Sequence, residues 1–165
     1  MELDVPGTLV RLLFVRAAWD LDGPPDLEPP SPRPPTGTST RPDSAGLEAA
    51  WSTLWRAAAR GEHTSNAPPW QAVLGMDGLD MPALREWSNA TRQRINTEVL
   101  GQGRPPRRTI LASRSLSGKD AGLSSIVIIP VDGPYAARVA PHRLVVSETT
   151  FADDSMWAGA LAAGE

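Results

Sequence analysis

The strongest periodic pattern of apolar residues lies between residues 44 and 61. Its apolar side chains recur at spacings of three and four: Leu47, Trp51, Leu54, Trp55 and Ala58. This spacing gathers them on one side of an α-helix and leaves the other side to charged and polar residues. The pattern therefore predicts an amphipathic helix that has Asp43 or Ser44 available as its N-cap and ends at Gly61.

Three further segments favour helices. Residues 70–76 follow two prolines and can form about two helical turns. Residues 82–100 carry apolar residues at helical spacing, and Asp80 stands where an N-cap is needed. A short terminal helix is predicted over residues 153–163, with Asp153 or Thr150 at its start.

Four segments favour β-strands. Residues 8–16, TLVRLLFVR, are apolar on both alternating faces, which is typical of a strand covered on both sides. Periodicity alone leaves a buried helix as the alternative for that run. The other three strands are expected at residues 108–114, 124–131 and 142–149, with glycine-containing turns between them.

The order of these elements is one strand, a long loop, several helices, three strands and a last helix. Helices and strands that are segregated along the chain indicate the α+β class. The sequence therefore predicts one small α+β domain over residues 1–165, with two or three helices packed on a sheet of about four mostly antiparallel strands. Residues 8–16 are expected at the centre of that sheet, paired with the C-terminal strands.

A proline tract, residues 22–43, separates the first predicted strand from the first helix and holds eight of the 17 prolines. It contains two PxxP frames, but the usual basic residue is absent from the flanking positions of both. The tract is therefore interpreted as a stiff crossing inside the domain rather than as a docking motif. Its acidic first half is expected to face the arginine-rich part of the molecule.

Composition and charge narrow the classes of partner. The formal net charge is −3, which gives no general attraction to nucleic acid or anionic membranes. The chain has no cysteine, so disulfides and thiolate chemistry are excluded. Glu2 and Asp4 stand where a signal peptide needs positive charge, and no apolar run approaches a membrane span. We expect a cytoplasmic protein without a membrane partner.

The sharpest local charge feature is an arginine cluster between residues 92 and 114, where Glu98 is the only acidic residue. Its members are Arg92, Arg94, Arg104, Arg107, Arg108 and Arg114. Arg104, Arg107, Arg108 and Arg114 are the candidate contacts for phosphate or nucleic acid. The alternative is a solvated face that binds nothing.

Two of the six tryptophans lack a periodic partner, and these are Trp19 and Trp70. Core packing is the default for a tryptophan, because its ring buries a large apolar area. If any of the six is an exposed interaction anchor, the sequence points to one of these two.

The inventory of catalytic and metal-binding residues is poor. His142 with Glu148 or Asp153 is the one candidate acid–base set, but a strand would hold His142 and Glu148 far apart. Glu148, Asp153 and Asp154 could form a hard-cation site, although helix capping explains carboxylates at that position better. No nucleotide or cofactor motif is present, so no metal or cofactor is expected.

These observations favour a non-catalytic protein-interaction or accessory module whose partner is another protein. One alternative is an anion binder for nucleic acid or phosphate through the Arg92–Arg114 cluster. A second alternative is an enzyme that uses His142 with Glu148 or Asp153.

Overall fold

A computed structural model describes residues 1–62, 69–101 and 105–163, with side chains of the last range from residue 112. Its four strands form one sheet in the order β1-β2-β4-β3. Their bounds are β1 (Glu2–Asp4), β2 (Ser125–Ile129), β3 (Ala136–Ala140) and β4 (Arg143–Ser147). β1 pairs with β2 and β2 with β4 in parallel, whereas β3 and β4 are antiparallel. The number of strands agrees with the prediction, but the sheet is mixed rather than mostly antiparallel.

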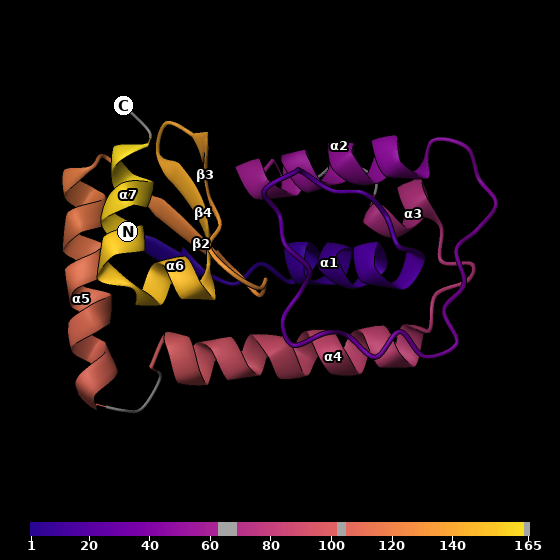
Figure 1. The fold of residues 1–165 in the computed structure, drawn as a ribbon, viewed down its shortest axis with the longest axis horizontal. Helices are drawn as coiled ribbons and strands as arrows, with labels where there is room; N and C mark the ends of the chain where they lie inside the picture. Colours follow the sequence, from indigo (N-terminus) through magenta and orange to yellow (C-terminus); the bar gives the residue numbers. More distant parts are fainter. Residues whose placement is uncertain (63–68, 102–104, 164–165) are drawn as a thin grey trace.

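The described residues also form seven α-helices and one π-helix, more than the two or three helices expected. They are α1 (Gly7–Trp19), α2 (Leu47–Arg60), α3 (Trp70–Leu74), α4 (Met81–Arg94), η1 (Ile95–Val99), α5 (Pro105–Asp120), α6 (Glu148–Ala152) and α7 (Asp154–Ala162). Figure 1 shows α5, α6 and α7 on one side of the sheet and α1, α2 and α3 on the other, with α4 running along both groups.

The apolar run at residues 8–16 lies in α1, so its prediction as a central strand was wrong. A helix surrounded on all sides can be apolar all round, just as a covered strand can. Here α1 packs between α2 and α4, and its large apolar side chains from Leu9 to Trp19 are almost fully buried. The segment that does pair with a C-terminal strand is β1, the three residues at Glu2–Asp4.

The segment at residues 108–114 was also wrongly expected as a strand, since it belongs to α5. Pro105 and Pro106 begin that helix, where their missing N–H groups cost nothing. The supposed turn after it contains Ser117 and Gly118, which are still helical. Gly118 is buried, and a Cβ there would approach Met1 and Ile126, so α5 packs closely on the sheet.

The remaining helix predictions are confirmed in their essentials. α2, α3, α4 with η1, and α7 lie where the apolar spacing placed them. Asp80 accepts a hydrogen bond from the Ala83 N–H, and Asp153 caps α7 in the same way through Met156. α2 differs in its start, because Gly46 is its N-cap and provides no side-chain hydrogen bond.

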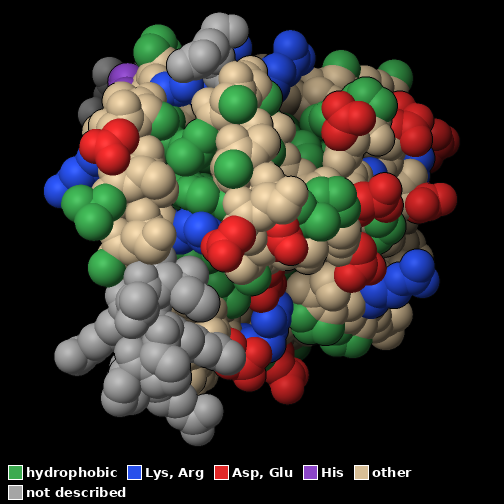
Figure 2. Space-filling model, turned by 60° about the vertical axis from the view of Figure 1, so that its left-hand side comes forward, with side chains coloured by type: hydrophobic (Ala, Val, Ile, Leu, Met, Phe, Trp, Pro, Cys, Tyr) green, Lys and Arg blue, Asp and Glu red, His purple; other side chains and the backbone are tan. Residues whose placement is uncertain are grey.

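Figure 2 turns the side with α5 and α7 forward, and among the side chains that it colours the basic ones are scattered. Acidic side chains are most numerous toward the right of this view. Within the described ranges, no helix combines the length and the apolar character needed to cross a bilayer.

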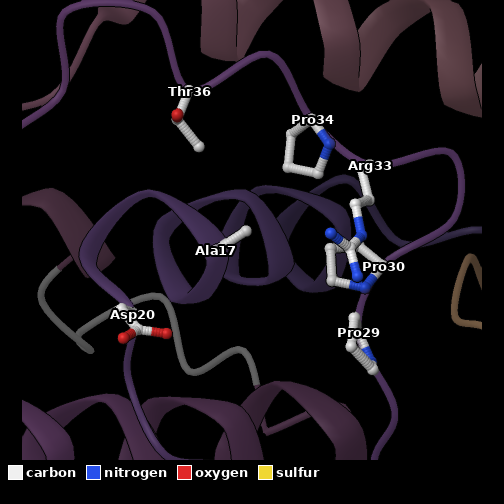
Figure 3. Close-up of a pocket in the computed structure, with 7 residues that line it drawn as sticks. All are labelled: Ala17, Asp20, Pro29, Pro30, Arg33, Pro34 and Thr36. Carbon is white, nitrogen blue, oxygen red and sulfur yellow. The ribbon is translucent and has the colours of Figure 1, made fainter.

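The proline tract is held against the rest of the fold by hydrogen bonds along its length. Pro30 forms a β-bridge with Val131, and the indole N–H of Trp87 donates to the Pro32 carbonyl at 3.0 Å. The Ser31–Pro32 peptide bond is cis. The tract curves beside the C-terminal end of α1 and encloses a pocket of about 360 Å³ with it (Figure 3).

Two acidic residues of the tract lie near an arginine that is not part of the predicted cluster. Asp22 and Glu28 lie near Arg16 on α1, and Arg16 donates to the Leu27 carbonyl at 2.7 Å. Burial lowers the pKa of Arg16, while the two carboxylates oppose that shift. The tract is thus tied to α1, the helix that precedes it.

Candidate binding site

The arginine cluster is divided among separate contacts in the described part of the chain. Arg104 and the side chains of Arg107 and Arg108 lie outside the described residues. Arg92 donates to the Val5 carbonyl at 3.2 Å and sits beside Gly7 at the start of α1. The described side chains of the cluster, Arg92, Arg94 and Arg114, each connect a different pair of segments inside the fold.

Arg94 joins α4 to the start of α6 through Glu148. Its guanidinium donates two hydrogen bonds to that carboxylate, at 2.7 and 2.6 Å. The same guanidinium reaches the Ser31 carbonyl of the proline tract at 3.4 Å. The hydrogen bonds to Glu148 raise the pKa of Arg94, and burial partly opposes that effect. A bidentate pair of this geometry is an internal clamp between three segments.

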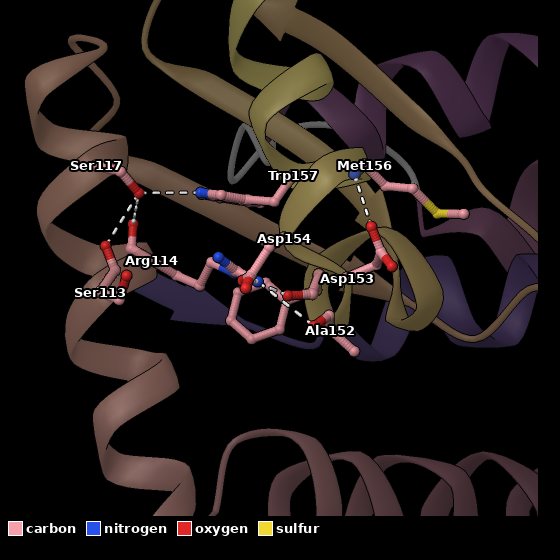
Figure 4. A network of polar contacts seen from close by, with 9 residues as sticks. Ser113, Arg114, Ser117, Ala152, Asp153, Asp154, Met156 and Trp157 are labelled. Atoms are coloured by element: carbon pink, nitrogen blue, oxygen red, sulfur yellow. Dashed lines mark hydrogen bonds and ion pairs between the residues drawn. The ribbon is translucent and has the colours of Figure 1, made fainter.

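Arg114 likewise connects α5 to the start of α7 through Asp154 (Figure 4). Only 5% of Arg114 is exposed; its Nε donates to the Phe151 carbonyl at 3.0 Å, and its Nη2 donates to Asp154 at 2.6 Å. The guanidinium also lies 5.5 Å from the centre of the Trp157 ring. Because these contacts occupy the side chain, Arg114 has a structural explanation that needs no anion.

The candidate catalytic residues are not brought together. His142 is exposed in the turn before β4, and Glu148 follows the other end of that strand. Glu148 is occupied by Arg94, Asp153 by the α7 cap and Asp154 by Arg114. Over the ranges that the structure describes, no three His, Asp or Glu residues gather as metal ligands.

Trp19 and Trp70 are both buried, with 1% and 5% of their surface exposed, so neither is an exposed anchor. Their indole N–H groups have no hydrogen-bond partner among the described residues. Trp70 nevertheless lines an open groove, which Trp19 does not.

We call this feature the α3 groove, a hollow of about 190 Å³ beside α3, α1 and α4. Its lining residues are Arg11, Trp70, Gln71, Met76, Met81, Leu84 and Arg85. Four of them are apolar, and two arginines stand among them. Neither arginine has an ion-pair partner in the described part of the protein, so both charges are available at the groove.

Exposed apolar side chains lie on α3 and just after it. Four large apolar side chains are exposed among the described residues, and two of them, Val73 and Met76, lie on or directly after α3. Their exposed fractions are 42% and 45%. Exposed methionine beside tryptophan and arginine is the composition found at the centres of protein interfaces.

Sequence reasoning named Trp70 but missed the other groove residues. Arg11 was assigned to a strand, and Met76 stood at the end of a short predicted helix with no partner to suggest exposure. The α3 groove therefore depends on three helices that only the tertiary structure brings together. Comparisons of the chain with protein-family models, with curated proteins and with solved structures find no match.

Proposed function

We propose that this protein is a non-catalytic interaction module that binds a segment of another protein in the α3 groove. The observation that supports this most strongly is the combination of a buried tryptophan wall, exposed Met76 and Val73, and two arginines without ion-pair partners. Binding at such a surface is favourable, because an apolar side chain that displaces water from it lowers the free energy of the complex.

The charges at the groove select the kind of segment. Arg11 and Arg85 favour a partner whose apolar anchor is flanked by Asp or Glu. The small volume of the groove suits one or two side chains rather than a folded surface. We therefore assign the site to a short acidic peptide segment that presents an apolar residue.

A displayed library of random peptides selected against the full chain tests this proposal. We expect enriched peptides to carry an aromatic or large aliphatic residue beside acidic residues. Their affinity, measured by fluorescence polarisation, should fall about tenfold for Met76→Ser and for Arg85→Glu, because each removes one class of contact.

The matched control is Leu116→Ser, which removes an equally apolar side chain that is 63% exposed on α5. It should leave the affinity of the selected peptides unchanged. The proposal fails if no peptide is enriched, or if enriched peptides respond to Leu116→Ser as they do to Met76→Ser.

The anion-binding alternative has less support. Arg94 and Arg114 are engaged inside the fold, and Arg92 donates to a backbone carbonyl. Binding of a DNA or RNA oligonucleotide that weakens steeply with salt and is lost on neutralising Arg104, Arg107 and Arg108 would favour it over the peptide.

A further inference from the structure

A second site lies on the opposite end of α1, at the pocket that this helix forms with the proline tract. We call it the proline pocket. Ala17 and Asp20 form its wall on the α1 side, and the wall on the tract side is formed by Pro29, Pro30, Arg33, Pro34 and Thr36. Its volume of about 360 Å³ falls in the range of pockets that hold small molecules. It shares no lining residue with the α3 groove.

The pocket carries one charge of each sign. Figure 3 shows Asp20 and Arg33 on opposite sides of the pocket, with Ala17 between them and the Asp20 carboxylate directed toward the other lining residues. Within the part of the chain that the structure describes, neither side chain has an ion-pair partner. The carboxylate can accept from an ammonium group, and the guanidinium can donate to a carboxylate.

Asp20 occupies a backbone position at the end of α1 that glycine most often takes. Asp20 follows α1 in the left-handed conformation, with φ of 49°, and its N–H donates to the Arg16 carbonyl. Glycine would perform this capping at lower conformational cost, because it has no Cβ. The side chain of Asp20 therefore adds a charge at the pocket that the helix end does not require.

The apolar wall is built from proline rings whose backbone is already fixed. The Ser31 N–H donates to the Pro130 carbonyl at 3.0 Å, and Trp87 and Arg94 hold the carbonyls of Pro32 and Ser31. Proline rings pack well against flat aromatic groups, as they do when proline-rich segments dock on aromatic side chains. A preformed wall of this kind loses little conformational entropy when a ligand binds.

We infer that the proline pocket binds a small zwitterion with an aromatic body, of the class of an aromatic amino acid or a dipeptide that contains one. Its ammonium group pairs with Asp20, its carboxylate pairs with Arg33, and its ring packs on the prolines. This binding goes beyond the peptide interaction proposed for the α3 groove and does not depend on it.

The test compares ligands that differ only in charge. Phenylalanine and glycyl-phenylalanine carry both charges, phenylpropionate lacks the ammonium group, and phenethylamine lacks the carboxylate. Titration of the full chain, followed by NMR shifts of backbone amides, should show changes at Ala17, Asp20 and Thr36. At least one zwitterion should bind about three to ten times more tightly than either singly charged compound.

Two variants, one at Asp20 and one at Arg33, test which charged group of the ligand each residue binds. Asp20→Asn, which tolerates the same backbone conformation, should weaken the zwitterion but not phenylpropionate, because the carboxylate that it removes repels an anion. Arg33→Gln should weaken the zwitterion but not phenethylamine, because the guanidinium that it removes repels a cation. Lys119→Gln, an exposed change on α5, is the control and should alter none of these affinities.

The inference is overturned if neither zwitterion shifts the amides that line the pocket, if all four compounds bind equally, or if the two variants behave like the Lys119→Gln control. Because the α3 groove is not part of this experiment, either outcome leaves the peptide proposal to its own test.

Discussion

Arginine side chains in this protein donate mainly to backbone carbonyls of distant segments. Arg16 reaches Leu27, Arg114 reaches Phe151, and Arg143 donates to the Ala59 carbonyl at 2.7 Å. A guanidinium has five N–H donors in a fixed fork, so it can serve several acceptors at one junction. For the described arginines, a local excess of positive charge in the sequence therefore does not mean that the guanidinium groups are free to bind an anion.

At the residue scale, Arg114→Met should lower the free energy of unfolding by about 2–3 kcal/mol, because the Phe151 and Ala152 carbonyls lose their charged donor. Asp154→Asn should cost less than about 1 kcal/mol, since the Asp154 side chain is 96% exposed and its ion pair is weakened by solvent. Urea unfolding of both variants measures the difference. Equal costs would mean that the ion pair, rather than the hydrogen bonds to carbonyls, dominates.

Asp80 gives a prediction about pH. Backbone hydrogen bonds from Ala83 and Thr38 lower the pKa of Asp80 below its ordinary value of 3.8. A carboxyl whose pKa is lowered in the folded state stabilises the protein at pH values above the pKa that it has in the unfolded chain. This stabilisation is lost as the pH falls through the pKa of the folded state. Asp80→Asn keeps a good N-cap without the titration. Its stability should fall less steeply below about pH 4 than that of the unmodified protein, as chemical unfolding at several pH values would show; identical slopes would contradict this.

The residues that sequence analysis placed correctly act over short distances in the chain. Asp80 and Asp153 cap helices through N–H groups three residues away, so their spacing in the sequence already contains the contact. Arg94 and Trp87 contact the proline tract across 63 and 55 residues. Nothing in the local sequence indicates such partners.

At the scale of elements, α1 shows why a strand and a buried helix were confused. Its apolar residues cover every side of the helix, so the run has no polar face that would reveal a period of 3.6. The surrounding elements decide the outcome, because α2 and α4 pack on α1. α2 was predicted correctly because its polar outer face makes the helical spacing of its apolar residues visible in the sequence.

Trp87 contacts the proline tract and Trp51 contacts α1, so replacing each one tests a different part of the structure. Both are buried and donate indole N–H bonds, Trp87 to Pro32 in the tract and Trp51 to Leu12 in α1 at 2.8 Å. Replacement of either by Phe should cost about 1–3 kcal/mol of unfolding free energy. Only Trp87→Phe should accelerate native-state hydrogen exchange at the Ser31 amide, which anchors the tract to Pro130.

Trp51→Phe is the control for global stability in that experiment. If both variants accelerate exchange at Ser31 by the same factor, the tract opens only when the whole protein unfolds, and Trp87 has no separate anchoring role.

At the scale of the whole molecule, the mixed sheet was beyond the reach of local patterns. β1 has three residues and pairs with β2 across most of the chain, with Leu3 opposite Ile126. β3 has weak alternation and small side chains, so it was not recognised, although it pairs with β4 across a short turn. Pairing partners and strand direction follow from how the helices pack, which no single segment encodes.

The position of α1 connects the fold with both proposed sites. Arg11 lines the α3 groove, and Ala17 and Asp20 line the proline pocket. The same helix contributes Leu9, Phe14 and Trp19 to a continuous core that includes residues of β2 and β4. We therefore expect residues 1–43 to belong to the same cooperative unit as the rest of the chain, rather than to form a separable arm.

The most direct test of this account is the behaviour of a chain that begins at residue 43. We predict that this fragment lacks cooperative thermal and urea unfolding and exposes apolar surface, because it loses α1 from the core and β1 from the edge of the sheet. A stable 43–165 fragment that unfolds in one sharp transition would contradict the central place of α1. It would also remove the physical basis for placing both binding sites on that helix.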